Sequence, residues 1–159
     1  MKWLRILSIA VAVSTACNRG GDSLTGPTSG GTSPVTVTVS PSPVTAEHCS
    51  PGCSADSGGS SFAFAANMTI KVAESAGSPA NIKSMTLTGT AGTVTFDPLV
   101  FSSSDIANQA GTTLVNAHGS LSIPVRIVYN TPSGSSTLSV NVSIELDNHL
   151  TASSHVNVI

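Results

Sequence analysis

The sequence predicts an all-β domain, a two-layer antiparallel β-sandwich of about seven strands, behind an N-terminal segment of a different kind. Two observations predict the sandwich. Apolar residues alternate with Ser, Thr and Asn along most of the chain after residue 34, and turn signals rich in Gly, Pro and Asn separate the alternating stretches. Helical periodicity is almost absent. Because two half-buried sheets can cover each other's apolar faces, this pattern favours a sandwich over any helical class.

The N-terminal segment, residues 1–16, has the layout of a secretory signal peptide. Lys2 and Arg5 supply positive charge, an apolar run continues to Val13, and small residues precede Cys17. The apolar run has about eight residues, whereas a membrane-spanning helix needs roughly 20. We therefore expect the protein to be exported, with no permanent transmembrane helix in this segment.

The boundary "VSTAC" resembles the lipobox of bacterial lipoproteins, in which cleavage before the cysteine leaves that residue acylated. The resemblance covers the first seventeen residues and departs from the family at Ser14, where leucine is usual. It implies that Cys17 is the lipidated first residue of the mature protein and that acyl chains attach it stably to a membrane. Asn18, in place of the aspartate that retains lipoproteins in the inner membrane, implies the outer membrane. The alternative is an ordinary signal peptide whose cleavage site lies beside a cysteine.

Residues 17–34 are predicted to link the anchor to the folded domain. The stretch "NRGGDSLTGPTSGGTSP" is dominated by Gly, Ser, Thr and Pro, and Leu24 is its only large apolar residue. Such a segment cannot bury enough apolar surface to fold, so we expect a flexible tether. Residues 35–159 have about the usual length of one domain, which we expect to be the β-sandwich.

The first half of this domain contains four expected strands. Val35, Val37 and Val39 alternate with Thr in the first, and "FAFAANMTIKV", from Phe62 to Val72, is a long second strand. The stretches "KSMTLTG" and "GTVTFDP" follow, joined by a glycine-bearing turn. A loop is expected between the first two strands, over residues 40–61.

The second half contains three expected strands: "SLSIPVRIVY", "TLSVNVSIELD" and "LTASSHVNVI". Pro124 lies in the middle of the first of them, which suggests an edge position or a bulge. Residues 98–117 are less regular; we expect them to connect the two sheets and to form a short helical turn at "SSDIANQ", with Ser104 as its cap. Phe101 in this connection is expected to pack in the core.

The architecture resembles the immunoglobulin-like domains of bacterial exported proteins. This resemblance covers residues 35–159 and rests on the strand pattern rather than on a motif. The buried tryptophan and the intersheet cysteine pair of antibody domains are missing, since the only tryptophan is Trp3. A jelly roll or a small barrel is an alternative that fits the same pattern.

The stretch "HCSPGC" predicts a disulfide between Cys49 and Cys53. Pro51 and Gly52 suit the middle of a type II turn, which brings the flanking residues together. Exported proteins reside in an oxidising compartment, where disulfides form and persist. Lipidation of Cys17 would leave two of the three cysteines, Cys49 and Cys53, free to pair with each other. So short a loop stabilises a fold by only about 2 kcal/mol. The alternative is a zinc or copper site.

A metal at this stretch would be held by His48, Cys49 and Cys53. Zinc sites usually take further ligands from a second cluster, and the other histidines, His118, His149 and His155, are isolated in the sequence.

Charge and motifs exclude several functions. Two of the six basic residues lie in the signal, which leaves four basic and eight acidic side chains, a formal net charge of −4. The four basic residues are scattered, so the positive patch that nucleic-acid binding requires is absent. Glu145, Asp147 and Asn148 offer too few oxygens for calcium. No nucleophile elbow or phosphate-binding loop occurs, so we expect no catalytic residue, no cofactor and no metal.

These observations predict a non-catalytic lipoprotein of the cell envelope. The domain would bind another protein or a surface polymer, or act as a spacer. Its recognition elements are expected on the two irregular segments, residues 40–61 and 98–117, or on an unpaired strand edge. The alternatives are a metal-handling lipoprotein that uses the His48, Cys49 and Cys53 loop, and an enzyme whose site the sequence does not reveal.

Overall fold

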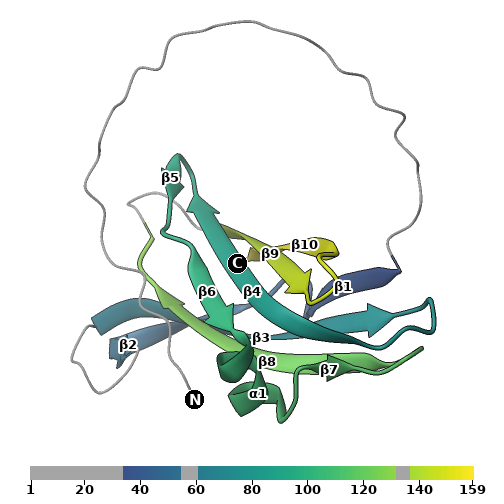
Figure 1. The fold of residues 1–159 in the computed structure, drawn as a ribbon. Helices are drawn as coiled ribbons and strands as arrows, with labels where there is room; N and C mark the ends of the chain where they lie inside the picture. Colours follow the sequence, from purple (N-terminus) through teal and green to yellow (C-terminus); the bar gives the residue numbers. More distant parts are fainter. Residues whose placement is uncertain (1–33, 55–60, 132–136) are drawn as a thin grey trace, which may run out of the picture.

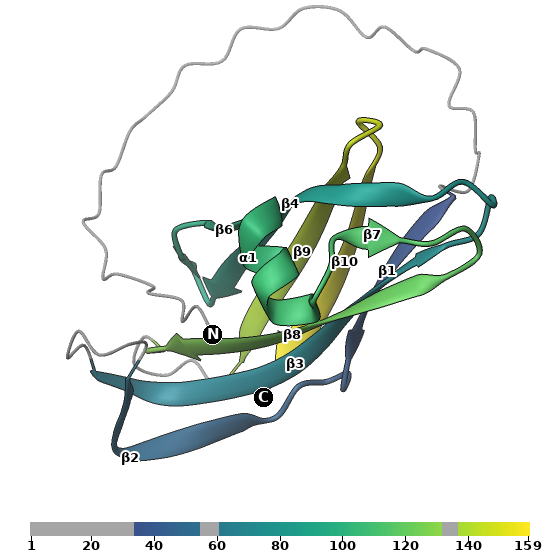
Figure 2. The ribbon, with the colours of Figure 1, turned by 60° about the horizontal axis from the view of Figure 1, so that its bottom comes forward.

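Two antiparallel sheets pack face to face in the computed structural model, which describes residues 34–54, 61–131 and 137–159. One helix, α1, lies along one side of the pair and contacts strands of both sheets (Figures 1 and 2). The predicted class is confirmed at this level: the chain is mostly β, and its core lies between two antiparallel layers. Two of the three predicted domain segments, the signal and most of the linker, lie outside the described residues.

The first sheet is built around one long central strand. Its members are β1 (Val35–Ser40), β2 (Ala46–Ser54), β3 (Ser61–Glu74) and β8 (Ser120–Tyr129). Strand β3 pairs with β1 and β2 along successive parts of one edge and with β8 along the other. Strand β8 is therefore an edge strand, which accounts for Pro124, since an edge tolerates a residue without a backbone donor.

The second sheet has the order β10, β9, β4, with three short strands along the other edge of β4. Its members are β4 (Ala80–Ala91), β5 (Val94–Thr95), β6 (Leu99–Ser102), β7 (Leu114–Val115), β9 (Leu138–Leu146) and β10 (Thr151–Val158).

A parallel contact joins the two ends of the domain. The backbone N–H of Val44 donates to the carbonyl of Asn157, and the N–H of Ile159 donates to the carbonyl of Val44, both at 2.9 Å. The segment after β1 thereby covers part of the free edge of β10, so part of this edge is not open to another strand.

Helix α1 (Ser103–Ala110) begins at a capping box one residue before its first turn. The hydroxyl of Ser102 accepts the N–H of Asp105, whose carboxylate accepts the N–H of Ser102 in return. The predicted cap at Ser104 is therefore wrong, because the reciprocal pair needs an acidic residue three positions after the cap. Gly111 ends the helix with a φ of +80°, and Ile106 is fully buried in the core.

The core fills the space between the sheets. Exposure alternates residue by residue along β1 and β9, as the sequence pattern predicts. Phe101 is buried, as expected. The largest side chains that are completely or almost completely buried are Ile70, Ile82, Met85, Ile106, Ile123, Leu138, Ile144 and Leu146.

Two expectations about irregular segments are wrong. Residues 40–61 contain β2, and residues 98–117 contain β6 and β7 in addition to α1. The sequence does not predict strand β2, because "HCSPGC" interrupts the alternation of apolar and polar residues. The register of its pairing with β3 shifts at the same place, between His48 and Cys53. Strands β6 and β7 have four and two residues, too few to show a period.

Candidate functional site

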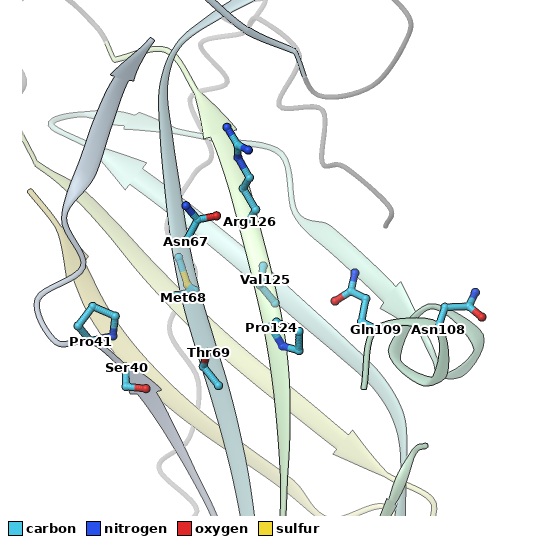
Figure 3. A pocket seen from close by; sticks show the side chains of 10 residues that line it. All are labelled: Ser40, Pro41, Asn67, Met68, Thr69, Asn108, Gln109, Pro124, Val125 and Arg126. Atoms are coloured by element: carbon cyan, nitrogen blue, oxygen red, sulfur yellow. The ribbon is translucent and has the colours of Figure 1, made fainter. Parts of the chain in front are cut away.

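An open groove crosses the outer face of the first sheet and has a volume of about 650 Å³. Figure 3 shows it from close by. Strands β3 and β8 form its floor, the end of β1 borders it on one side and the end of α1 borders it on the other (Figure 3). Its lining residues are Ser40, Pro41, Asn67, Met68, Thr69, Asn108, Gln109, Pro124, Val125 and Arg126.

The strand register places the polar residues of the floor. Asn67 lies directly opposite Arg126, and Thr69 lies directly opposite Pro124. Opposite residues share a face of the sheet, so these four side chains form a two-by-two set on the outer surface. Met68 and Val125 between them face the core.

One side chain gives this groove its charge. Among the ten described residues that line it, Arg126 is the only ionisable one. Lys71, two residues beyond Thr69 on β3, shares the outer face and is exposed. The face also carries one acidic residue of β2, Glu47, which lies opposite Ala65.

The third basic residue of the described chain lies on the second sheet. Lys83 forms a salt bridge with Glu145 at 2.7 Å, and Ser84 donates a hydrogen bond to the same carboxylate. The side-chain hydrogen bond from Lys83 holds the pKa of Glu145 below its usual value. Asn81 likewise donates to Asp147 at 3.0 Å and lowers the pKa of that carboxyl.

Glu145 and Asp147 therefore serve a surface network of the second sheet. Neither carboxylate is among the described residues that line the groove.

Another carboxylate has a structural role at the opposite end of β3. Glu74 is buried and accepts backbone N–H groups from Ala76, Gly77 and His118 at 2.6, 3.0 and 2.9 Å. The hydrogen bond from His118, helped by those from Ala76 and Gly77, holds the pKa of Glu74 below its ordinary value, although burial acts in the other direction. This carboxylate ties the turn after β3 to the turn before β8.

The sulfur atoms of Cys49 and Cys53 lie at disulfide distance, with Cα atoms 5.3 Å apart. The pair does not stand on a free loop as expected; it spans a bulge within β2. Gly52 has a φ of +145°, a backbone conformation that residues with a side chain rarely adopt, and a Cβ atom there would collide with the hydroxyl of Ser61, so a substitution would be strained.

The disulfide contacts Arg126, one of the residues that line the groove. Cys53 packs with Phe62, Ala65 and Val128 in a small cluster separate from the main core, and Cys49 covers it. The guanidinium of Arg126 donates to the sulfur of Cys53 at 3.7 Å. The bridge thus lies against a charged side chain that lines the groove, a relation that no local sequence pattern reveals.

The alternative of a metal held by His48, Cys49 and Cys53 does not fit the geometry of this stretch, because the two cysteine sulfurs lie at disulfide distance from each other. A disulfide offers no thiolate, which is the form of cysteine that binds zinc or copper. The ring of His48 lies edge-on to that of Phe64, which stacks on Tyr129. Across the described ranges, no group of three His, Cys, Asp or Glu side chains is placed to hold a metal ion.

One Ser–His contact exists on the outer face of the second sheet. The hydroxyl of Ser139 and Nε2 of His155 are 2.6 Å apart, on neighbouring strands β9 and β10. His155 is exposed on a regular strand, where the backbone N–H groups alternate toward neighbouring strands rather than converging on one point. A nucleophile needs converging donors and an oriented base, so this contact does not make an active site.

The remaining predicted site residue, Cys17, lies outside the described residues. In the described part of the chain, no helix has the length and apolar character needed to cross a bilayer.

Comparisons with known proteins add little to this geometry. No protein-family model matches the sequence, and no curated protein matches it significantly. Among solved structures, Pseudomonas fluorescens alkylpurine DNA glycosylase AlkC bound to DNA containing an abasic site analog aligns with 82% of this chain, at 10% sequence identity and a TM-score of 0.39. The aligned region is 32% of that chain, so the present chain spans about a third of its length. A likeness this weak supports no conclusion about fold or function.

Proposed function

We propose that this protein is a lipid-anchored, non-catalytic module of the bacterial cell envelope, which binds a surface polymer or another protein through the outer face of its first sheet. The observation that supports binding is the open groove there, with amide, hydroxyl and guanidinium groups from three strands and a helix. Such a surface can hold a ligand by hydrogen bonds. A reaction would need a nucleophile and a base within reach of each other, and Arg126 is the only ionisable group among the described residues of the groove lining.

We further propose that the domain is immunoglobulin-like. Counting β1, β3, β4, β6, β8, β9 and β10 as its seven main strands, the first, second and fifth share one sheet, and the third, sixth and seventh share the other. Strands A, B and E, and strands C, F and G, are distributed in this way in the immunoglobulin fold. The fourth strand, β6, departs from the antibody pattern because it pairs with β4 rather than with β8.

The anchor is proposed from the N-terminal sequence. Cleavage before Cys17 and acylation of that residue would hold the protein on a membrane, and Asn18 favours the outer membrane in bacteria with the aspartate sorting rule. The linker after Cys17 has the composition of a flexible tether that would hold the domain clear of the lipid headgroups.

Fractionation of a bacterial host that expresses the full chain tests this proposal. The native protein is expected in the membrane pellet after a high-salt wash, whereas Cys17→Ser is expected in the soluble exported fraction. The matched control is the double variant Cys49→Ala, Cys53→Ala, which also removes cysteines but should stay in the pellet. Retention of Cys17→Ser in the washed pellet would contradict a lipid anchor.

A further inference from the structure

We propose that two copies of this chain associate edge to edge through strand β10, whose residues Thr151 to His155 pair antiparallel with the same residues of the second copy. The two second sheets would then form one continuous sheet. This inference goes beyond the proposed function, because it concerns a contact between two copies of the module rather than the groove. Its basis is an unpaired stretch of backbone at the edge of the second sheet.

Every second residue of β10 directs its backbone N–H and C=O away from β9. The carbonyl of Asn157 accepts the N–H of Val44, so Asn157 faces outward from the sheet. By the alternation of an antiparallel strand, Thr151, Ser153 and His155 face the same way. Within the described ranges, no other strand pairs with these three residues on that side. They therefore present three N–H and three C=O groups to an added strand.

The beginning of β10 is also incompletely covered on its inner face. The even-numbered side chains point between the sheets, and Val156 and Val158 are buried there, whereas Ala152 and Ser154 are only half-buried. Leu150, directly before the strand, is 37% exposed. Figure 2 shows that the hairpin joining β9 to β10 projects past the neighbouring strands. A strand added at this edge would cover apolar surface as well as pair backbone groups.

The other sheet edges carry features that oppose pairing with another chain. Strand β8 contains Pro124 and contacts α1, and β1 contacts β10. Strand β2 is interrupted by its bulge, and β6 has four residues and leads directly into α1. Strand β10 contains no proline and no Lys, Arg, Asp or Glu, and its pairing with β9 is regular. Proline, charge, bulges and covering elements are the usual protections of an edge, and the first half of β10 lacks all of them in the described structure.

The exposed groups of β10 fit a second copy of the same strand. A two-fold axis beside Ser153 places this residue opposite its equivalent and places Thr151 opposite His155 of the second copy. Each opposed pair of outward residues exchanges two hydrogen bonds, so the three pairs form six. A two-fold interface uses the same surface twice, and in this register no two ionisable side chains lie opposite each other.

Membrane attachment would favour this association. One short edge gives a smaller interface than the roughly 1,200 to 2,000 Å² of stable complexes, so pairing is expected to be weak in dilute solution. The proposed anchor at Cys17 would confine the copies to one surface and raise their effective concentration. The expected place of the pair therefore rests on the proposed function, whereas the pairing itself does not.

Cysteine cross-linking in membranes from cells that express the full chain tests the pairing. Opposed hydrogen-bonded residues have Cα atoms about 5.5 Å apart, which is within disulfide range. Copper phenanthroline should therefore convert Ser153→Cys into a disulfide-linked dimer on a non-reducing gel. The matched control is Ser143→Cys, since Ser143 lies opposite Ser153 on β9 and is equally exposed on the outer face. Its equivalents would lie about 14 Å apart, so we expect at least tenfold less dimer.

A mixed experiment tests the register. Thr151→Cys and His155→Cys chains, with tags of different mass, are expressed in the same cells and oxidised in the same way. We expect at least fivefold more cross-linked product between the two variants than within either, because each residue lies opposite the other in the second copy.

Sedimentation equilibrium of the purified full chain in density-matched detergent measures the association without a cross-linker. Ser153→Lys places two positive charges directly opposite each other and should weaken the dimer at least tenfold. Ser143→Lys adds the same charge on the neighbouring strand and should change the dissociation constant less than threefold. Both positions are exposed, so circular dichroism should show an unchanged fold.

Equal cross-linking of Ser153→Cys and Ser143→Cys, or equal effects of the two lysine substitutions, would overturn the proposal. A cross-link from Ser153→Cys to a protein of different mass, without a dimer, would assign the edge to that protein instead. A monomer in all of these measurements, in a protein that Cys17→Ser still releases from the membrane, would remove the self-association while the anchored module stands.

Discussion

Removal of the disulfide should cost the domain a modest and calculable amount of stability. The cysteines are four positions apart, and closing so small a loop reduces the entropy of the unfolded chain by an amount worth about 2 kcal/mol at 25 °C. Cys53 is buried against Phe62, Ala65 and Val128, and losing a buried group of this size adds roughly 1 kcal/mol. The double variant Cys49→Ala, Cys53→Ala should therefore be less stable by about 2 to 3 kcal/mol.

Thermal unfolding followed by circular dichroism measures this loss. For a domain of this size, 2 to 3 kcal/mol corresponds to a fall in Tm of roughly 6 to 12 °C. Dithiothreitol provides the internal control: it should lower the Tm of the native protein toward that of the variant and leave the variant unchanged. A native Tm that does not respond to complete reduction would refute the reasoning. A loss above about 5 kcal/mol would show that the small cluster under the bridge is part of the main core.

Two further predictions concern stability. Glu74→Gln should destabilise the protein at pH 7, because it removes the negative charge that accepts hydrogen bonds from three backbone N–H groups. The pKa of Glu74 is lower in the folded state than in the unfolded state. The stability that its charge contributes is therefore complete above the unfolded pKa of about 4.3 and is lost as the pH falls through the folded pKa. Urea unfolding should show the gap between native protein and variant shrinking from pH 7 to acid, and a gap independent of pH would contradict this role. Ile144→Ala, at a completely buried position of β9, should lower the free energy of unfolding by about 2 to 5 kcal/mol in the same assay. The control is Val100→Ala, at a position that is 61% exposed, which should change it by less than about 0.5 kcal/mol. Equal effects of the two substitutions would contradict the placement of the core.

The long strands were predictable because burial on one face leaves a period of two in the sequence. Val35 to Val39 and Leu138 to Leu146 alternate cleanly, and the structure buries the expected residues. Strand β2 was not predictable, since its bulge at the disulfide breaks the alternation and its position is fixed by pairing with β3 rather than by its own residues. The cap of α1 shows the same limit on a small scale, because several adjacent serines could each serve as the cap and only the reciprocal pair with Asp105 selects Ser102.

The groove was harder to predict from the sequence than the strands were. Recognition was expected on the irregular segments or at an edge, and the groove does take Asn108 and Gln109 from one of those segments. Its floor, however, belongs to the regular outer faces of β3 and β8. Asn67 and Arg126 are 59 positions apart and become neighbours only through the register of two strands. The outward Asn and Arg were visible in the sequence as solvent-facing residues, and nothing local distinguished them from the other polar residues of the sheets.

The most direct test of the central proposal, an envelope module held by a lipid anchor, is the mass of the N-terminal peptide of the protein purified from membranes. Proteolysis followed by mass spectrometry should find a peptide that begins at Cys17 and carries the added mass of its acyl chains. A mature N-terminus at any other residue, or an unmodified Cys17, would contradict the account.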